Sequence, residues 1–308
     1  MLSATPALPP THARHPGLVL ALVVALLSIA AAAVFIREAA PTPPLVIAGW
    51  RLVLAGIAYS AYAAVTRGRH GALSTEGAAP KAVMSLAALG AGACYAVHFG
   101  AWISSLWLTT LAASTTLVTA SPLVLALHGA VTGRDRPSTS LWLALGIAAV
   151  GVICIATGGD ASGTAPAPVL GNALAFLGAG AMAVYLLLTR RLGGRIDLTR
   201  FSAIATLAGG AMLLALSLAL GQSLLPRTAA SVGWIVVSAL IPQLLGHTLI
   251  TWSMQHTTPT TVGLVTLGEP VVTTALGVWL YGEVPSAAVL TGCGLTLLAV
   301  VVTLRARR

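Results

Sequence analysis

Long apolar runs are the feature of this chain that most restricts its fold. Ten stretches of about 20 residues are almost free of charged side chains, and only 7% of all residues are charged. An α-helix needs roughly 20 apolar residues to cross the hydrocarbon core of a bilayer. Since backbone polar groups in lipid must be paired within the helix, these runs predict ten transmembrane helices. The predicted spans are 17–36, 45–66, 82–104, 107–131, 139–157, 169–189, 201–221, 230–254, 260–281 and 286–304.

The 16 Lys and Arg residues are distributed unevenly between the predicted connectors. If the N-terminus lies in the cytoplasm, thirteen of them fall on the cytoplasmic side, Arg37 and Arg227 fall outside, and Arg51 lies within a span. Cytoplasmic connectors of membrane proteins carry an excess of basic residues. The count therefore predicts a multi-pass protein of the cell (plasma, or inner) membrane with both termini cytoplasmic. The net charge of +9 does not indicate nucleic acid, because no basic stripe with interleaved aromatic residues occurs.

A repeat divides the chain into two halves. A step of 148 residues aligns Pro122 with Pro270 and Gly129 with Gly277, within windows 105–138 and 253–286 that share eight identities. Five spans per half is an odd number, so the second half enters the membrane from the opposite side, which predicts an inverted repeat. The predicted units are a cytoplasmic tail (1–16), a first five-helix repeat (17–157), an external linker (158–168), a second five-helix repeat (169–304) and a cytoplasmic tail (305–308).

Short motifs late in each half resemble a known family. They are Ser121-Pro122-Leu123-Val124 with Gly133-Arg134-Asp135-Arg136-Pro137-Ser138, and Glu269-Pro270-Val271-Val272 with Gly282-Glu283-Val284-Pro285-Ser286. Together with Trp50-Arg51, they are similar to two tandem EamA domains of the drug/metabolite transporter superfamily. In the first half the acidic residue of the motif is displaced to Asp135. The resemblance implies an all-α bundle of ten helices around a central cavity, and export of small metabolites, amino acids or drugs.

Polar side chains within apolar spans are costly in lipid and mark the expected substrate path. The third span carries four such residues on one helical face, and the eighth span carries three. The repeat sets these faces opposite each other, which predicts a substrate site near the bilayer midplane. Packing between helices explains the same stripes equally well. The residues are Tyr95, His98, Trp102 and Ser105 in the third span, and Gln243, His247 and Thr251 in the eighth.

Two charged residues and two prolines complete the candidates. Arg51 lies six residues inside the second span, where it can snorkel outward or bind a carboxylate of the substrate. Glu269 is the only acidic residue so deep in a span, and it can exchange a proton, hold a substrate amine or support the break at Pro270. Pro122 and Pro270 each clash with the carbonyl four residues earlier. They therefore predict paired kinks that act as hinges or as fixed bends.

Several further residues bear on how the helices pack. Pro242, directly before Gln243, predicts a disturbed eighth helix. Asn172 and Tyr185 in the sixth span are additional candidates for the substrate path. Close helix approach is expected at Gly90, Gly92, Gly178 and Gly180.

These features favour a secondary active or facilitative carrier that exports small amphipathic metabolites by alternating access. One alternative is an intramembrane enzyme acting on a lipid or isoprenoid, but the chain has no HExxH and no GxSxG motif. Another is a channel, although no ring of charges or carbonyls is evident. No nucleotide-binding loop, metal motif or cofactor site occurs, so a small-molecule substrate and the bilayer are the expected partners, without an ATPase. Proton coupling and the oligomeric state stay open.

Overall fold

The computed structural model describes residues 17–66, 81–132, 139–158, 165–192, 198–256 and 268–305, and the elements in these ranges are all helices. Each of the ten predicted spans overlaps at least one of them. The first half has α1 (Leu18–Ala30), α2 (Ala32–Glu38), α3 (Pro44–Thr66), α4 (Lys81–Ser105), α5 (Leu111–Val118), α6 (Ser121–Val131) and α7 (Thr139–Thr157). The second half has α8 (Pro168–Leu192), α9 (Leu198–Ala219), α10 (Ala229–Ser238), the π-helix η2 (Ala239–Gly246), α11 (His247–His256), α13 (Glu269–Tyr281) and α14 (Ala287–Arg305).

Six of the described helical stretches are long and apolar enough to cross a membrane. They are Leu18–Glu38, Pro44–Val65, Met84–Ser105, Pro168–Thr189, Thr199–Ala219 and Ala229–Ile250. Two shorter apolar helices cover Trp142–Ile155 and Ala287–Ala299. The predicted span 107–131 is divided between α5 and α6, and α13 is the described part of 260–281. An all-α membrane fold is therefore present, while ten complete crossings and their inversion stay predictions.

The two prolines paired by the repeat, Pro122 and Pro270, stand at helix starts. Pro122 is the second residue of α6, and the chain breaks between α5 and α6 at Thr119 and Ala120. Pro270 is likewise the second residue of α13. Proline suits the first turn of a helix because its missing N–H has no partner to lose there. At Pro122 the structure thus has two turn residues between separate helices where the sequence predicts a kink in a continuous helix. The residues 257–267 before α13 lie outside the described ranges, so the kink at Pro270 stays a prediction.

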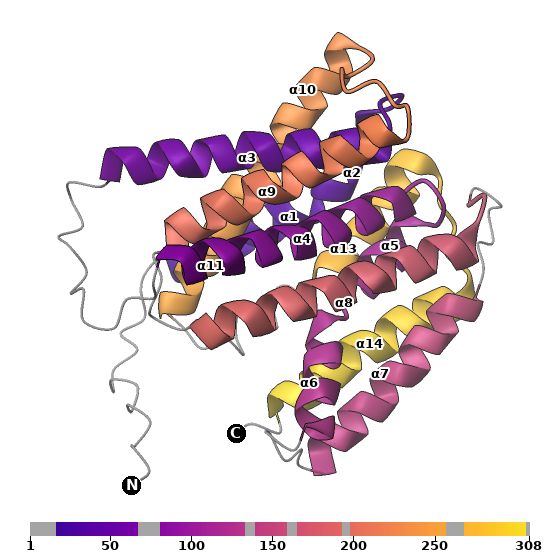
Figure 1. Cartoon of the computed structure of the whole chain (residues 1–308). Coiled ribbons are helices and arrows are strands. Elements are labelled where there is room, and N and C mark those ends of the chain that lie inside the picture. Colours follow the sequence, from indigo (N-terminus) through magenta and orange to yellow (C-terminus); the bar gives the residue numbers. More distant parts are fainter. Residues whose placement is uncertain are drawn as a thin grey trace, which may run out of the picture.

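Helices from the two halves pack against each other (Figure 1). The most extensive pairings are α3 with α9, α7 with α14, and α4 with both α8 and α9. The 148-residue step maps α3 onto α9 and α7 onto α14, so each of these pairs consists of related helices. The same step maps α4 onto the segment that contains η2 and α11, and it maps α8 onto α1. Just as α4 packs on α8, η2 and α11 pack on α1. This is the contact pattern expected of two halves related by a two-fold axis.

Close helix approach depends on two of the four predicted glycines. A Cβ on Gly92 would lie 2.9 Å from the carbonyl oxygen of Ala205 in α9, and a Cβ on Gly178 would lie 3.2 Å from that of His98. Gly90 and Gly180 have nothing within 4 Å of such a Cβ. Gly92 and Gly178 therefore allow the backbones to approach, as small residues do between membrane helices, whereas the other two do not.

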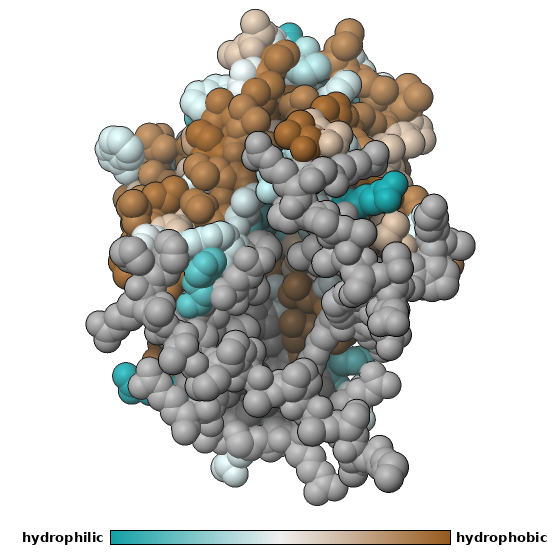
Figure 2. All heavy atoms as spheres, turned by 90° about the vertical axis from the view of Figure 1, so that its left-hand side faces the viewer, coloured by the Kyte–Doolittle hydropathy of each residue, from teal (hydrophilic) through white to brown (hydrophobic). Residues whose placement is uncertain are grey.

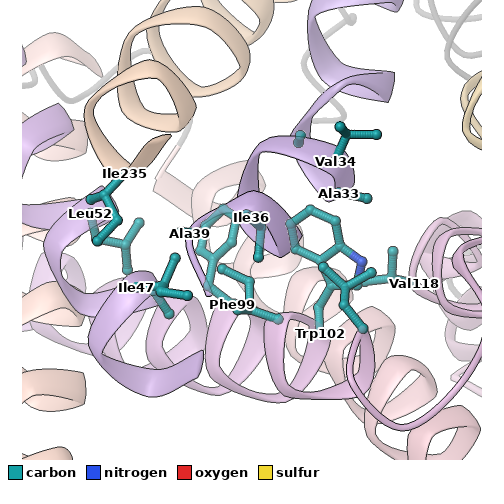
Figure 3. Packing of buried hydrophobic residues seen from close by; sticks show 14 of the residues in the cluster. Ala33, Val34, Ile36, Ala39, Ile47, Leu52, Phe99, Trp102, Val118 and Ile235 are labelled. Carbon is teal, nitrogen blue, oxygen red and sulfur yellow. The ribbon is translucent and has the colours of Figure 1, made fainter. Parts of the chain in front are cut away.

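Apolar side chains occupy both the interior and the surface. Figure 3 shows part of the main core, in which Phe99 and Trp102 of α4 lie beside α2, with Val118 of α5 next to Trp102. Large apolar side chains also point outward, with Leu20, Val65 and Trp279 between 68% and 78% exposed. Figure 2 shows such residues gathered over the upper part of one face. A surface of this kind would aggregate in water and suits contact with lipid.

Candidate functional site

A buried arginine lies at the centre of the bundle. The side chain of Arg51, on α3, is 1% exposed. Its guanidinium carbon lies 4.9 Å from the centroid of the Phe99 ring and 5.7 Å from that of the Trp102 ring. A guanidinium at these distances is attracted to the faces of aromatic rings. Arg51 therefore does not snorkel to the surface; it turns inward against two aromatic residues of α4.

Hydrogen bonding leaves most of this guanidinium unsatisfied. Its Nη2 donates to the side-chain oxygen of Gln243 at 3.2 Å, which ties α3 to the π-helix η2. Tyr59 of α3 donates to the backbone carbonyl of the same glutamine at 3.4 Å. Nε and Nη1 of Arg51 are buried and have no hydrogen-bond partner in the described part of the chain, and the same is true of Nε1 of Trp102. Two of the three guanidinium nitrogens therefore have no acceptor among the described residues.

Glu269 supplies negative charge near Arg51 without binding it directly. It is the first residue of α13 and is 8% exposed. The charges of Glu269 and Arg51 interact through space. Among the described residues, however, no salt bridge joins the two, and none donates a hydrogen bond to the Glu269 carboxylate. The two charges are therefore close enough to interact, but no direct bond joins them in the described part of the chain.

Two histidines, one from the third and one from the eighth predicted span, lie near Arg51. The Nδ1–H of His98 donates to the carbonyl of Gly178 at 2.8 Å, where the glycine lets α4 and α8 approach. The His98 ring lies edge-on to Phe99 with centroids 4.6 Å apart. His247 is close enough to both Arg51 and His98 for their charges to interact. The structure thus gathers five of the predicted site residues, namely Arg51, His98, Trp102, Gln243 and His247.

The remaining candidates lie at the margins of this group or outside the described side chains. Tyr95 stacks on Tyr185 with ring centroids 4.3 Å apart, which joins α4 to α8. Ser105, fully buried, bonds to the carbonyl of Trp102 at 2.6 Å and to the Ser114 hydroxyl at 2.7 Å, so it joins α4 to α5. The side chains of Thr251 and Pro122 are not among those described.

A second charged group, which we call the Arg37 cluster, lies at the end of the bundle where α2 and α13 finish. It consists of Arg37, Glu38, Tyr281 and Glu283. Arg37 forms a salt bridge with Glu283 and donates to the carbonyls of Leu106 at 2.9 Å and Thr109 at 3.0 Å. The other carboxylate oxygen of Glu283 accepts the backbone N–H of Leu111, at the start of α5, at 2.8 Å.

Tyr281 completes this cluster at its exposed rim. Its ring centroid lies 5.1 Å from the Arg37 guanidinium carbon, and its hydroxyl donates to Glu38 at 2.9 Å. A cavity of about 270 Å³ lies against the cluster, lined by Arg37, Leu106, Trp107, Thr109, Tyr281 and Glu283. Every charged group of the Arg37 cluster is therefore bonded, and the cluster joins the ends of α2, α4, α5 and α13.

Sequence reasoning missed the Arg37 cluster because it treated Arg37 and Glu283 as connector charges. One signal was present: Gly282 precedes Glu283 directly after an apolar run. Gly282 has φ of +62°, a left-handed conformation that ends α13 and returns the chain toward α5. The backbone N–H of Glu283 then bonds to the carbonyl of Gly277 at 3.2 Å. A glycine that ends a helix directly before an acidic residue can thus reverse the chain, so that the acidic side chain contacts the bundle.

Metal ligands do not cluster in the described ranges. No group of three or more His, Cys, Asp and Glu residues there is arranged to hold a metal ion. The polar centre around Arg51 offers instead an arginine, an amide, two histidines and a carboxylate among aromatic rings. Such a mixture is suited to binding a small polar or charged organic molecule.

Comparison with known proteins places this geometry in a family. A solved structure titled "Crystal structure of protein" matches with a TM-score of 0.62 and 22% identity, covering 95% of this chain and 98% of that chain. At this identity the likeness shows the fold alone. A search of curated proteins gives no match. The model of the EamA-like transporter family matches residues 15–157 and 169–305, as two tandem domains that cover most of the chain. The protein is therefore a multi-span membrane protein that belongs to the EamA-like transporter family.

Proposed function

We propose that this protein is a carrier that exports a small amphipathic metabolite across the cell membrane by alternating access. The observation that carries the proposal is the polar centre around Arg51, which is enclosed by helices of both halves. Inverted-repeat carriers bind their substrates between the halves, near the middle of the bilayer. The aromatic and ionic groups of this centre suit an amphipathic molecule.

The Arg37 cluster serves as the closed gate in this proposal. It links α2 to the connector after α13 and to the start of α5, so helices of both halves are held together at one end. Opening that end requires the Arg37 to Glu283 salt bridge to break. Alternating access then consists of exchanging this closure for a closure at the opposite end, while the polar centre stays between the halves.

Coupling to protons is assigned to Glu269 in the same proposal, with His98 as the second candidate. Glu269 is buried, has no hydrogen bond from described residues and shares a region with Arg51. A carboxylate so placed can take up and release a proton as the bundle opens and closes. Substrate and proton would then compete for the same set of charges, which is a simple way to couple their movements.

The direct test is flux through the purified protein in liposomes. We expect saturable counterflow of at least one compound from a panel of amino acids, organic acids and amphipathic drugs. Flux that rises without saturation would favour a channel, and absence of flux across the whole panel would contradict the carrier. Liposomes without protein, and liposomes with heat-denatured protein, are the controls.

A further inference from the structure

Arg51 is a buried cation whose guanidinium is only partly hydrogen-bonded by the described residues. It is 1% exposed, donates one hydrogen bond of 3.2 Å to a neutral amide, and leaves Nε and Nη1 without partners among the described residues. Buried charges in folded proteins are normally paired and hydrogen-bonded, because the desolvation of an unpaired ion is costly. The cation–π contacts with the two aromatic rings offset only part of this cost. Within the described residues, Nε and Nη1 of Arg51 therefore lack a negatively charged group that bonds to them directly.

The missing group can be described by its chemistry. A guanidinium is a planar fork of donors that matches the two oxygens of a carboxylate. Arg51 is the one permanent cation among the described residues of this centre, and the nearby Glu269 already provides negative charge. A group with two negative charges, such as a phosphate ester, would be repelled by Glu269. A singly charged carboxylate would be repelled less by Glu269 while still pairing with Arg51.

The part of the ligand next to its carboxylate can be inferred from the rings. Phe99 and Trp102 are 2% and 4% exposed and lie against the guanidinium, so a ligand bound to Arg51 meets aromatic surface at once. The indole N–H of Trp102 also lacks an acceptor in the described part of the chain. Arg51 and Trp102, which are neighbours, thus both have N–H groups without an acceptor among the described residues.

We propose that Arg51 binds the carboxylate of the transported molecule, and that Phe99 and Trp102 contact the apolar part beside it. This assignment rests on the proposed carrier function, because Nε and Nη1 are buried here and a ligand reaches them only when the helices move. The substrate class is accordingly a monocarboxylate with an apolar or aromatic body. Neutral and purely cationic relatives of such a molecule do not satisfy Arg51.

The test is binding of matched acid and amide pairs to the purified full chain in detergent. The pairs are benzoate and benzamide, phenylacetate and phenylacetamide, and phenylalanine and phenylalaninamide. Affinity is measured by calorimetry and by the rise in melting temperature. We expect at least one acid to bind tenfold or more tightly than its amide. If no acid in the panel exceeds its amide, the proposal is wrong.

Two variants of Arg51 separate binding from folding. Arg51→Met removes the charge and fills similar space; because the charge is unpaired, the melting temperature without ligand should stay the same or rise. Its preference for acid over amide should vanish. Arg51→Lys keeps a charge but loses the planar fork, so an acid should bind about tenfold more weakly than to the wild type. Retention of the full acid preference by either variant would overturn the assignment, and Arg51→Lys decides the matter if Arg51→Met does not fold.

A control and a flux measurement complete the design. Arg227→Met removes an exposed cation from a connector and should leave the acid preference unchanged. If the wild type binds acids selectively yet shows no flux of any compound, the carrier function fails while the carboxylate site stands. If it transports neutral or cationic compounds and ignores acids, the carrier stands and the carboxylate assignment fails.

Discussion

Two arginine and glutamate pairs lie within the described bundle, and they differ in how they are bonded. In the Arg37 cluster, Arg37 binds Glu283 directly, and both residues have further partners on the backbone. In the centre, Arg51 and Glu269 interact only through space. The first pair has every feature of a structural contact. The second pair has the features of a binding site that exchanges its ligand.

This difference predicts that substitutions in the two places have different effects on folding. Removing a member of a bonded buried pair leaves the other charge without compensation, which is strongly destabilising. Removing a charge that has no bonded partner relieves a cost that the folded protein already carries. The same kind of substitution should therefore have opposite effects on folding in the two places.

The largest effect is expected for Glu283→Ala. The substitution leaves Arg37 without its salt bridge and the N–H of Leu111 without its acceptor. We expect the free energy of unfolding to fall by about 3 kcal/mol, the lower end of the range for broken buried pairs, because Arg37 keeps two carbonyl partners. Reversible unfolding in mixed micelles measures this change in the free energy of unfolding. Glu38→Ala, at the rim of the same cluster, is the control and should cost far less; equal losses would contradict a central role for Glu283.

Two tryptophans test the contrast without changing charge. Trp50 donates its indole N–H to the carbonyl of Leu224 at 2.7 Å, whereas the indole N–H of Trp102 has no described partner. Replacement by Phe removes the same ring volume from each. Trp50→Phe should therefore lower the free energy of unfolding by about 1 kcal/mol more than Trp102→Phe does. A larger loss at Trp102 in the same measurement would show that its N–H is bonded in the folded protein.

A smaller effect is expected at the rim of the Arg37 cluster. Tyr281→Phe removes the hydroxyl that binds Glu38 but keeps the ring against Arg37. Because this hydrogen bond is exposed, the loss should be about 0.5 kcal/mol, at the low end for hydrogen bonds. Tyr281→Leu also removes the cation–π contact and should cost about 0.5 kcal/mol more. Thermal unfolding of both variants checks the order, and a reversed order would mean that the ring contributes nothing.

The smallest effect on folding and the clearest effect on transport are expected for Glu269→Gln. Its carboxylate accepts no hydrogen bond from described residues, so the free energy of unfolding should change by less than about 0.5 kcal/mol. If Glu269 carries the coupled proton, the variant should no longer concentrate substrate against a gradient but should still exchange it. Flux with and without an imposed pH gradient distinguishes these modes. Glu38→Gln is the matched control, and undiminished uphill transport by Glu269→Gln would exclude Glu269 as the coupling group.

The positions of the helices could be predicted from the sequence because the requirement for apolar residues in lipid acts locally. The ends of α3, α4, α7 and α14 lie within a few residues of the predicted spans. Pro242 likewise predicted a disturbed helix, and the structure has a π-helix from Ala239 to Gly246. In each case the cause and the effect lie within a few residues of each other.

Contacts between distant segments could not be read in the same way. Ser105 shares a helical face with Tyr95, yet it is the last residue of α4, where the chain turns and Ser114 becomes its partner. Gly90 and Gly92 look alike in sequence, but only Gly92 faces α9. Helical periodicity predicts which residues share a face of one helix, but it does not predict which other helix packs against that face.

The separation of Arg37 and Glu283 along the chain has a consequence for biosynthesis. The two residues are 246 positions apart, so the salt bridge forms only after nearly the whole polypeptide has been made. At roughly 5 to 20 residues per second, the ribosome needs about 12 to 50 seconds to travel that distance. During this interval Arg37 has only the carbonyls of Leu106 and Thr109 as partners, and the backbone N–H of Leu111 lacks the carboxylate that accepts it in the finished protein. Arrival of the last helices therefore completes an unfinished membrane intermediate, and nascent chains that stop before residue 283 should be the ones that quality-control proteases recognise.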